Sequence, residues 1–291
     1  MDSRIADLHD EYLHSSMGRR EFLNRLAVLT GGTAAAYATL ALIEGKSAMA
    51  DLTPENDERL SIEMITYPGA SGNQVSAYKA RPKGTEKLPA VIVLHANRGL
   101  WQHFKDVARR VALEGYVVIA PDLLSRSGGT PGGDSRGPEG DAALEALAKI
   151  PRADLEADLV KAVEFLKTNP ETTGKVGVIG FCWGGGHVLS LAVNSPLLDA
   201  AVSFYGEQPE SGYEKINANI LMNYAENDPR LTGGLPAFEE KMKANSKPYE
   251  LYVYPGTQHA FNQDDRPDRY VKEAAELAWS RSIVFFGKNL K

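Results

Sequence analysis

The stretch from Lys175 to His187, KVGVIGFCWGGGH, constrains the fold of this chain more than any other. A short apolar run over 176–179 leads into Gly-Phe-Cys-Trp-Gly and two further glycines. This pattern predicts a strand, a very sharp turn and a helix that begins near Trp183. The glycines that flank Cys182 leave room for the strand and the helix to cross closely. We interpret the segment as a nucleophile elbow in which cysteine takes the central position.

The elbow would give Cys182 the surroundings of a reactive thiol. The backbone N–H of Trp183 follows it at the helix N-terminus, where it can stabilise a developing oxyanion. The same helix end is expected to favour the thiolate form of the cysteine. The alternative is a structural role, because a free cysteine is often a small buried hydrophobe in a core turn. The choice between the two depends on residues further along the chain.

Bulk composition excludes several classes of protein. The chain has 291 residues, of which 43% are hydrophobic, and this suits one large α/β domain or two small ones. The formal net charge is -6 and the basic residues are scattered among more numerous acids, so nucleic-acid binding is not expected. A single cysteine excludes an intrachain disulfide and a cysteine-based zinc cluster. No apolar run is long enough for a membrane span.

The first fifty residues differ from the rest. The segment 18–24, GRREFLN, carries paired arginines, and an apolar stretch rich in Ala, Thr and Gly follows over 26–43. A small-x-small cleavage motif, Ala-Met-Ala, then ends at Ala50. Together these features resemble a twin-arginine export signal, which predicts cleavage after Ala50 and a periplasmic mature protein. The alternative is an amphipathic N-terminal helix that is retained, in which case the protein would be cytoplasmic. Residues 1–50 are therefore set apart from a predicted domain over 51–291.

Strand and helix patterns alternate from residue 60 onward. Two alternating runs, 62–67 and 74–80, predict a β-hairpin. Continuous apolar runs predict buried strands at 90–94, 116–120, 176–179, 200–204, 220–224 and 250–254. Helical spacing predicts helices at 104–112, 141–150, 153–167, 235–244 and 268–289, and a loop rich in Gly, Ser and Pro covers 124–140. The alternation predicts one doubly wound α/β domain with a mostly parallel sheet.

A cysteine nucleophile needs a base, and the base needs a group that orients it. In elbow enzymes of this plan the order along the chain is nucleophile, acid, histidine, each after a later strand. The loop AENDP after 220–224 supplies Asp228, with Glu226 as the substitute acid, and the loop PGTQHAF after 250–254 supplies His259. We therefore predict a triad of Cys182, Asp228 and His259. His187 is expected to face the surroundings of its helix rather than the thiol.

The oxyanion site needs a second donor, which this plan places in the loop after an early strand. That loop is HANRGL, and the backbone N–H of Asn97 is the predicted partner of the Trp183 N–H.

Five segments together resemble the dienelactone hydrolase (carboxymethylenebutenolidase) family of the α/β-hydrolase superfamily. They are HANRGL, GYVVIAPDLL, GFCWGGG, AENDPR and PGTQHAF, and the likeness extends from about Leu60 to the C-terminus. The resemblance implies a core of about eight strands, no cofactor, and hydrolysis of a cyclic enol-lactone through an acyl-cysteine intermediate.

The chain departs from the family pattern at two places. Ala96 stands where the family usually has a glutamate, which is thought to help switch the cysteine between thiol and thiolate. Of the two arginines that hold the substrate carboxylate, one matches Arg126, whereas the other falls near the neutral Gln263. Arg98 or Arg266 are candidate replacements. These departures favour a related ester or lactone over dienelactone itself.

The leading hypothesis is thus a cysteine hydrolase that acts on a small-molecule ester or lactone. One rival is a hydrolase-fold binding protein without turnover, which the alanine at position 96 favours. Another keeps the site but changes the substrate to a thioester or a haloester. The sequence leaves open the physiological substrate and whether the protein forms a homo-oligomer.

Overall fold

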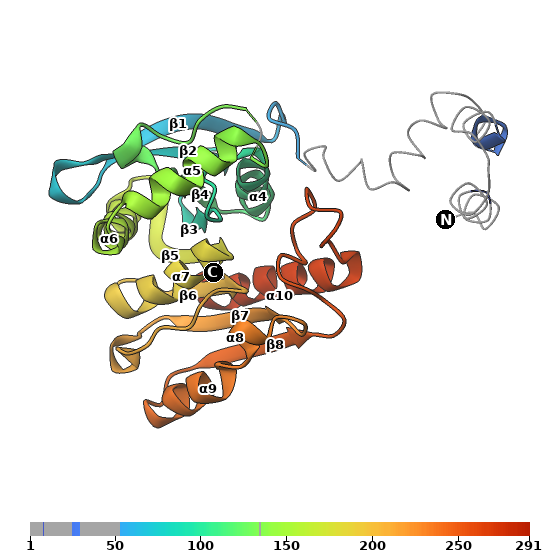
Figure 1. Cartoon of the computed structure of the whole chain (residues 1–291). Coiled ribbons are helices and arrows are strands. Elements are labelled where there is room, and N and C mark those ends of the chain that lie inside the picture. Colours follow the sequence, from blue (N-terminus) through green and yellow to red (C-terminus); the bar gives the residue numbers. More distant parts are fainter. Residues whose placement is uncertain (1–7, 9–24, 30–52, 134) are drawn as a thin grey trace. The chain divides into compact units, whose positions relative to one another are not determined.

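The computed structural model describes residues 8, 25–29, 53–133 and 135–291 (Figure 1). The chain divides into a larger compact unit, Asp51–Gln263 with Arg269–Lys291, and a smaller one, Met1–Ala50 with Asp264–Asp268. The fold below is that of the larger unit. The twin-arginine-like segment 18–24 and the expected cleavage site after Ala50 lie outside the described residues. Among the residues described, no helix has the length and apolar character that a membrane crossing requires.

The larger unit is built on one sheet, whose described strands number eight in the order β1-β2-β4-β3-β5-β6-β7-β8 (Figure 1). β2 is antiparallel to both of its neighbours, and every other neighbouring pair is parallel. The predicted hairpin and the mostly parallel sheet are confirmed, and the order is that of an α/β-hydrolase. The strands are β1 Leu60–Pro68, β2 Gln74–Pro82, β3 Leu88–Leu94, β4 Val117–Pro121, β5 Thr172–Phe181, β6 Ala200–Phe204, β7 Asn219–Ala225 and β8 Tyr249–Tyr254.

The helices lie close to the predicted ranges, except that the short helix after Asp228 was not predicted. They are α4 Gln102–Leu113, α5 Pro138–Lys149, α6 Arg152–Thr168, α7 Trp183–Asn194, α8 Pro229–Thr232, α9 Leu235–Ala244 and α10 Lys272–Leu290, with 3-10 turns at Ala70–Gly72, Ser125–Ser127 and Tyr213–Lys215. α5 begins earlier than predicted because Pro138 is well suited to a first helical turn. α10 begins later than predicted: Val271 is extended and its N–H donates to the Phe261 carbonyl, so the helix begins after it.

Helices cover both faces of the sheet. A Cβ on Gly177 of β5 would meet Phe286 of α10, whereas a Cβ on Gly180 would meet Val188 of α7. Because side chains alternate along a strand, these two helices pack on opposite faces. α6 contacts α7, and the Arg110 guanidinium of α4 lies 5.4 Å from the Trp279 ring of α10. The central strands are therefore buried on both sides, which explains their uninterrupted apolar sequence.

One buried carboxylate ties the hairpin to the helical layer. Asp158 of α6 accepts hydrogen bonds from the Ala70 N–H at 2.7 Å and from the Asn73 amide at 2.9 Å, both in the β1–β2 turn. It also binds the Arg126 guanidinium through Nε at 2.8 Å and Nη2 at 2.9 Å. The Asp158 side chain is 4% exposed. Such a paired geometry is stabilising only while both charges are present.

We expect Asp158→Ala to destabilise the protein by about 3 kcal/mol, because it leaves the Arg126 guanidinium without its main partner. Asp154→Ala is the matched control, since Asp154 lies on the same helix, is 43% exposed and is 4.0 Å from Arg126. The control should cost about 0.5 kcal/mol. Urea unfolding midpoints measure both. Equal midpoints for the two variants would show that the Asp158 network contributes nothing special.

Candidate active site

The turn between β5 and α7 holds Cys182 in a strained backbone conformation, with φ 57° and ψ −119°. A non-glycine residue adopts such angles only when its surroundings enforce them. The Cys182 N–H donates to the Phe204 carbonyl at 3.0 Å, and the Cys182 carbonyl accepts from Gly186 at 3.1 Å. A Cβ on Gly180 would lie 2.6 Å from the Gly184 carbonyl oxygen. The glycines are thus required by the close approach of the helix to the strand.

Cys182, His259 and Asp228 form a continuous hydrogen-bonded chain. Asp228 follows β7 and His259 follows β8, so parallel strands bring both loops to the edge where β5 ends. His259 Nε2 lies 3.1 Å from Cys182 Sγ, and His259 Nδ1 lies 2.6 Å from Asp228 Oδ2. An ionised carboxylate can only accept a hydrogen bond, so Nδ1 carries the proton and acts as the donor in its hydrogen bond to Asp228. Nε2 is then an acceptor directed at the thiol.

The loops that carry Asp228 and His259 are also joined to each other. The Asn227 N–H donates to the Thr257 carbonyl at 2.9 Å, and the Gly256 N–H donates to Glu226 Oε2 at 2.8 Å. Glu226, the substitute acid considered from the sequence, is therefore engaged with the backbone of the histidine loop rather than with the imidazole.

Burial dominates the electrostatics of the thiol. It raises the pKa of Cys182 above the ordinary value, although a hydrogen bond from the Trp183 N–H acts in the opposite direction. Arg230 also lowers the pKa, whereas Asp228 and Glu207 raise it. The expected preference for the thiolate at the helix end is thus outweighed by desolvation. At neutral pH the resting residue is a thiol.

A cavity of about 460 Å³ opens onto the thiol. Cys182, Trp183 and Asn97 line its reactive end, and Glu207 and Arg230 form an ion pair of 3.0 Å at its border. The Asn97 N–H donates no hydrogen bond to any residue that the structure describes, which leaves it available to a ligand. The two backbone donors expected for the oxyanion thus belong to residues of one cavity.

The two arginines predicted to bind substrate lie elsewhere. Arg126 is held by Asp158, and Arg98 Nη1 forms an ion pair of 2.8 Å with Asp141; neither lines the cavity. The cations that do line it are Arg152 and Arg230. Arg230 stands two residues after Asp228 in the AENDPR segment, and that position was a usable signal. Arg152 begins a helix and gives no such signal in the sequence.

His187 of α7 also lines the cavity. Its ring centre lies 4.1 Å from that of Trp183, and the residue is 4% exposed. Burial, together with the nearby Arg152, lowers its pKa to about 4. The imidazole is therefore uncharged at neutral pH.

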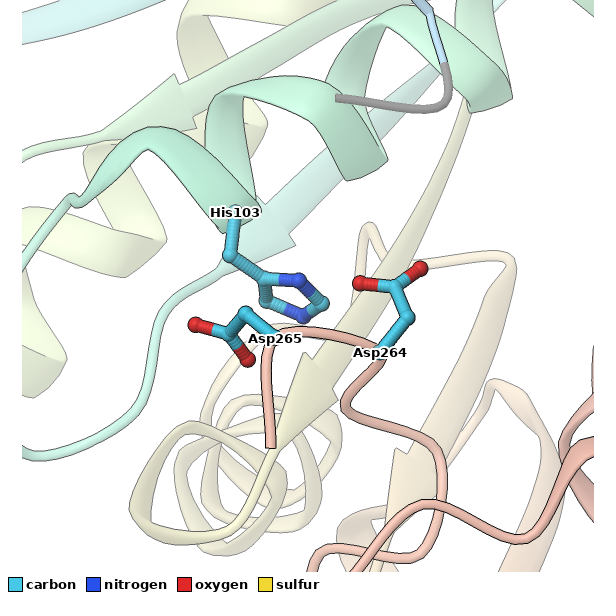
Figure 2. A group of neighbouring side chains, drawn as sticks. All are labelled: His103, Asp264 and Asp265. Atoms are coloured by element: carbon cyan, nitrogen blue, oxygen red, sulfur yellow. The ribbon is translucent and has the colours of Figure 1, made fainter. Parts of the chain in front are cut away.

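Figure 2 labels three further polar side chains, His103, Asp264 and Asp265, each of which offers an atom that could bind a metal. Asp264 and Asp265 belong to the smaller compact unit and His103 to the larger one. None of the three lines the cavity next to Cys182, and we assign no metal site to them.

Known proteins share both the sequence and the fold of this chain. The model of the dienelactone hydrolase family matches residues 75–290. A candidate carboxymethylenebutenolidase of Escherichia coli (strain K12) is 34% identical over 82% of this chain and 92% of its own length. Another, of Saccharolobus solfataricus, is 32% identical over 77% of this chain and 98% of its own length.

Solved structures agree with this relationship. A candidate dienelactone hydrolase of Klebsiella pneumoniae is 28% identical, with a TM-score of 0.69, over 79% of this chain and 99% of its own. The dienelactone hydrolase-like phosphotriesterase P91, from metagenomic libraries, shares the fold with a TM-score of 0.69 at 21% identity, over 80% of this chain and 100% of its own. The chain belongs to the dienelactone hydrolase family of α/β-hydrolases and is a carboxylic ester hydrolase.

Proposed function

We propose that the protein hydrolyses an ester or lactone with Cys182 as nucleophile, His259 as general base and Asp228 as the group that orients the base. The observation that supports this most directly is the hydrogen-bonded chain from thiol to imidazole to carboxylate, with distances of 3.1 and 2.6 Å. This is the arrangement that a nucleophile, a base and an orienting group require.

In the first half of the reaction, His259 Nε2 takes the thiol proton as Cys182 Sγ attacks the ester carbonyl carbon. The carbonyl π electrons move to oxygen, and the backbone N–H groups of Asn97 and Trp183 stabilise the oxyanion. Collapse of this intermediate expels the alcohol oxygen, which receives the proton from His259. The acyl group remains on sulfur as a thioester.

In the second half, His259 Nε2 removes a proton from water, and the oxygen of this water attacks the thioester carbonyl. A second oxyanion forms in the same site. Its collapse breaks the carbon–sulfur bond, and sulfur regains the proton from His259. The carboxylic acid leaves, and no external oxidant, reductant or metal is required. Asp228 stabilises the imidazolium that forms in each half.

The sulfur nucleophile restricts the class of ester. When the first intermediate collapses, the better leaving group departs, and a thiolate leaves more readily than an alkoxide. A phenol or enol, with a pKa near 10, competes with a thiol much better than an aliphatic alcohol does. Activated esters and enol lactones are therefore the preferred substrates, ahead of simple alkyl esters.

Replacement of Cys182 by Ala should lower kcat/KM for p-nitrophenyl acetate by about 1000-fold or more, and Asp228→Asn by about 100-fold or more. Glu226→Gln is the matched control, because that carboxylate lies in the same loop but binds the Gly256 N–H instead of the imidazole. The control should stay within about threefold of the unmodified enzyme. Steady-state kinetics measure all three.

Hydrolysis that persists in Cys182→Ala would contradict the nucleophile assignment. An unmodified protein that binds esters saturably but turns over none of a panel of lactones, aryl esters, thioesters and haloesters would instead be a binding protein. A preference within that panel assigns the substrate class.

Alkylation of Cys182 by iodoacetamide should rise with pH and reach its midpoint above about 8.5, the ordinary pKa of a cysteine thiol. The sign follows from burial, which raises the pKa of Cys182 and so lowers the thiolate fraction at neutral pH. Mass spectrometry of the modified protein gives the rate at each pH. A midpoint below that of free cysteine would show that a preformed thiolate–imidazolium pair exists in the resting enzyme.

A further inference from the structure

The cavity next to Cys182 extends along α7, away from the reactive end. Trp183, Gly186 and His187 line it in succession along that helix. Arg152, which also lines it, donates from Nη2 to Ser190 Oγ at 2.6 Å, one turn further on. Four residues separate Trp183 from His187, which corresponds to about 6 Å of helix. The lining thus extends along α7 from the thiol toward the Arg152 side chain.

The opposite wall of this cavity is apolar. Leu144, Leu147 and Ala148 of α5 line it, and their i, i+3, i+4 spacing places them on one face of the helix. Ile150 and Leu155 continue the wall into α6. Neither α5 nor this part of α6 supplies a residue of the triad or of the oxyanion site.

The residues of α7 that line the cavity carry no charge. His187 is neutral at neutral pH, since burial holds its pKa near 4 with Arg152 and His95 acting in the same direction and Glu156 against them. Its ring packs against the Trp183 indole. The one cation at this end, Arg152, is bound by Glu156 Oε1 at 2.7 Å as well as by Ser190.

We propose that the space between α5 and α7 is an acyl subsite that takes an unbranched or cyclic apolar acyl group of medium length. This inference rests on the proposed function, because it places the group relative to the acyl-cysteine. Apolar walls and a volume within the range of small-molecule sites suit such a group. The Glu207–Arg230 pair marks the other border, where both side chains are mostly exposed. The leaving alcohol and the incoming water use that polar border, while the acyl group stays under α5.

Measurement of kcat/KM for p-nitrophenyl acetate, butyrate and hexanoate tests the subsite. Each buried methylene contributes ~0.8 kcal/mol, equivalent to about fourfold, so the hexanoate should exceed the acetate by at least about tenfold after incomplete burial. A flat or falling profile would overturn the proposal.

Variants on α5 locate the effect. Ala148→Trp places an indole in the subsite from an exposed position, and it should lower the hexanoate-to-acetate ratio by at least about fivefold, since several methylene contacts are lost. Ala142→Trp is the matched control, because Ala142 is exposed on the same helix but does not line the cavity. The control should leave the ratio unchanged. Thermal unfolding verifies that both variants are folded.

A second variant tests the same wall of the cavity without placing a larger side chain on α5. Leu144→Ala removes apolar contacts without adding bulk and should lower the ratio about threefold, whereas Leu277→Ala, at a position 47% exposed on α10, should not change it. Equal effects of Ala148→Trp and Ala142→Trp, or no effect of Leu144→Ala, would contradict the subsite.

The alternative is that the alcohol group of the ester lies under α5. Comparison of kcat/KM for phenyl acetate and 4-butylphenyl acetate tests this placement. If Ala148→Trp changes that discrimination and leaves the acyl series unaffected, the acyl assignment is overturned. The proposed subsite and the proposed nucleophile can be contradicted independently of each other. Turnover that survives Cys182→Ala contradicts the nucleophile, whereas a flat acyl series in an enzyme that Cys182→Ala inactivates contradicts only the subsite.

Discussion

The close crossing of α7 over β5 is the constraint on which the rest of the site depends. A side chain at Gly184 would meet the Leu94 carbonyl oxygen at 2.8 Å, so the helix begins in contact with the backbone of β3 as well. This approach holds Cys182 at a positive φ and directs it to the edge where the parallel strands end. The loops after β7 and β8 reach the same edge because their strands are parallel to β5 through β6. A single steric requirement for glycine thereby sets the place where the three groups meet.

Much of this arrangement could be predicted from the sequence, because the signals are local. Buried parallel strands show as short apolar runs, and the elbow shows as glycines at fixed spacing around Cys182. Asp228 and His259 could be chosen since each follows such a run in the required order. The order along the chain does not favour Asp228 over Glu226. The structure distinguishes them, because the Glu226 carboxylate accepts a hydrogen bond from the Gly256 N–H instead of binding the imidazole.

Features that depend on distant partners could not be predicted. Arg126 stands in a loop that suggests a ligand-binding role, but its partner Asp158 lies 32 residues away on another element. The apolar face of α5 shows in the sequence as an ordinary amphipathic pattern, and nothing there indicates that it covers a cavity next to α7. The protonation state of the thiol depends on two opposing effects: the helix end favours the charged form, and burial opposes it. The amount of burial is set by the fold and could not be predicted from the sequence.

The burial of Cys182 also affects how readily the sulfur is oxidised. Peroxides and other oxidants attack the thiolate far faster than the thiol, and oxidation beyond the sulfenic acid is irreversible for most proteins. The chain has one cysteine, so no second thiol within it can rescue an oxidised sulfur by forming a disulfide. A buried sulfur that stays protonated at neutral pH is therefore oxidised more slowly than a thiolate would be.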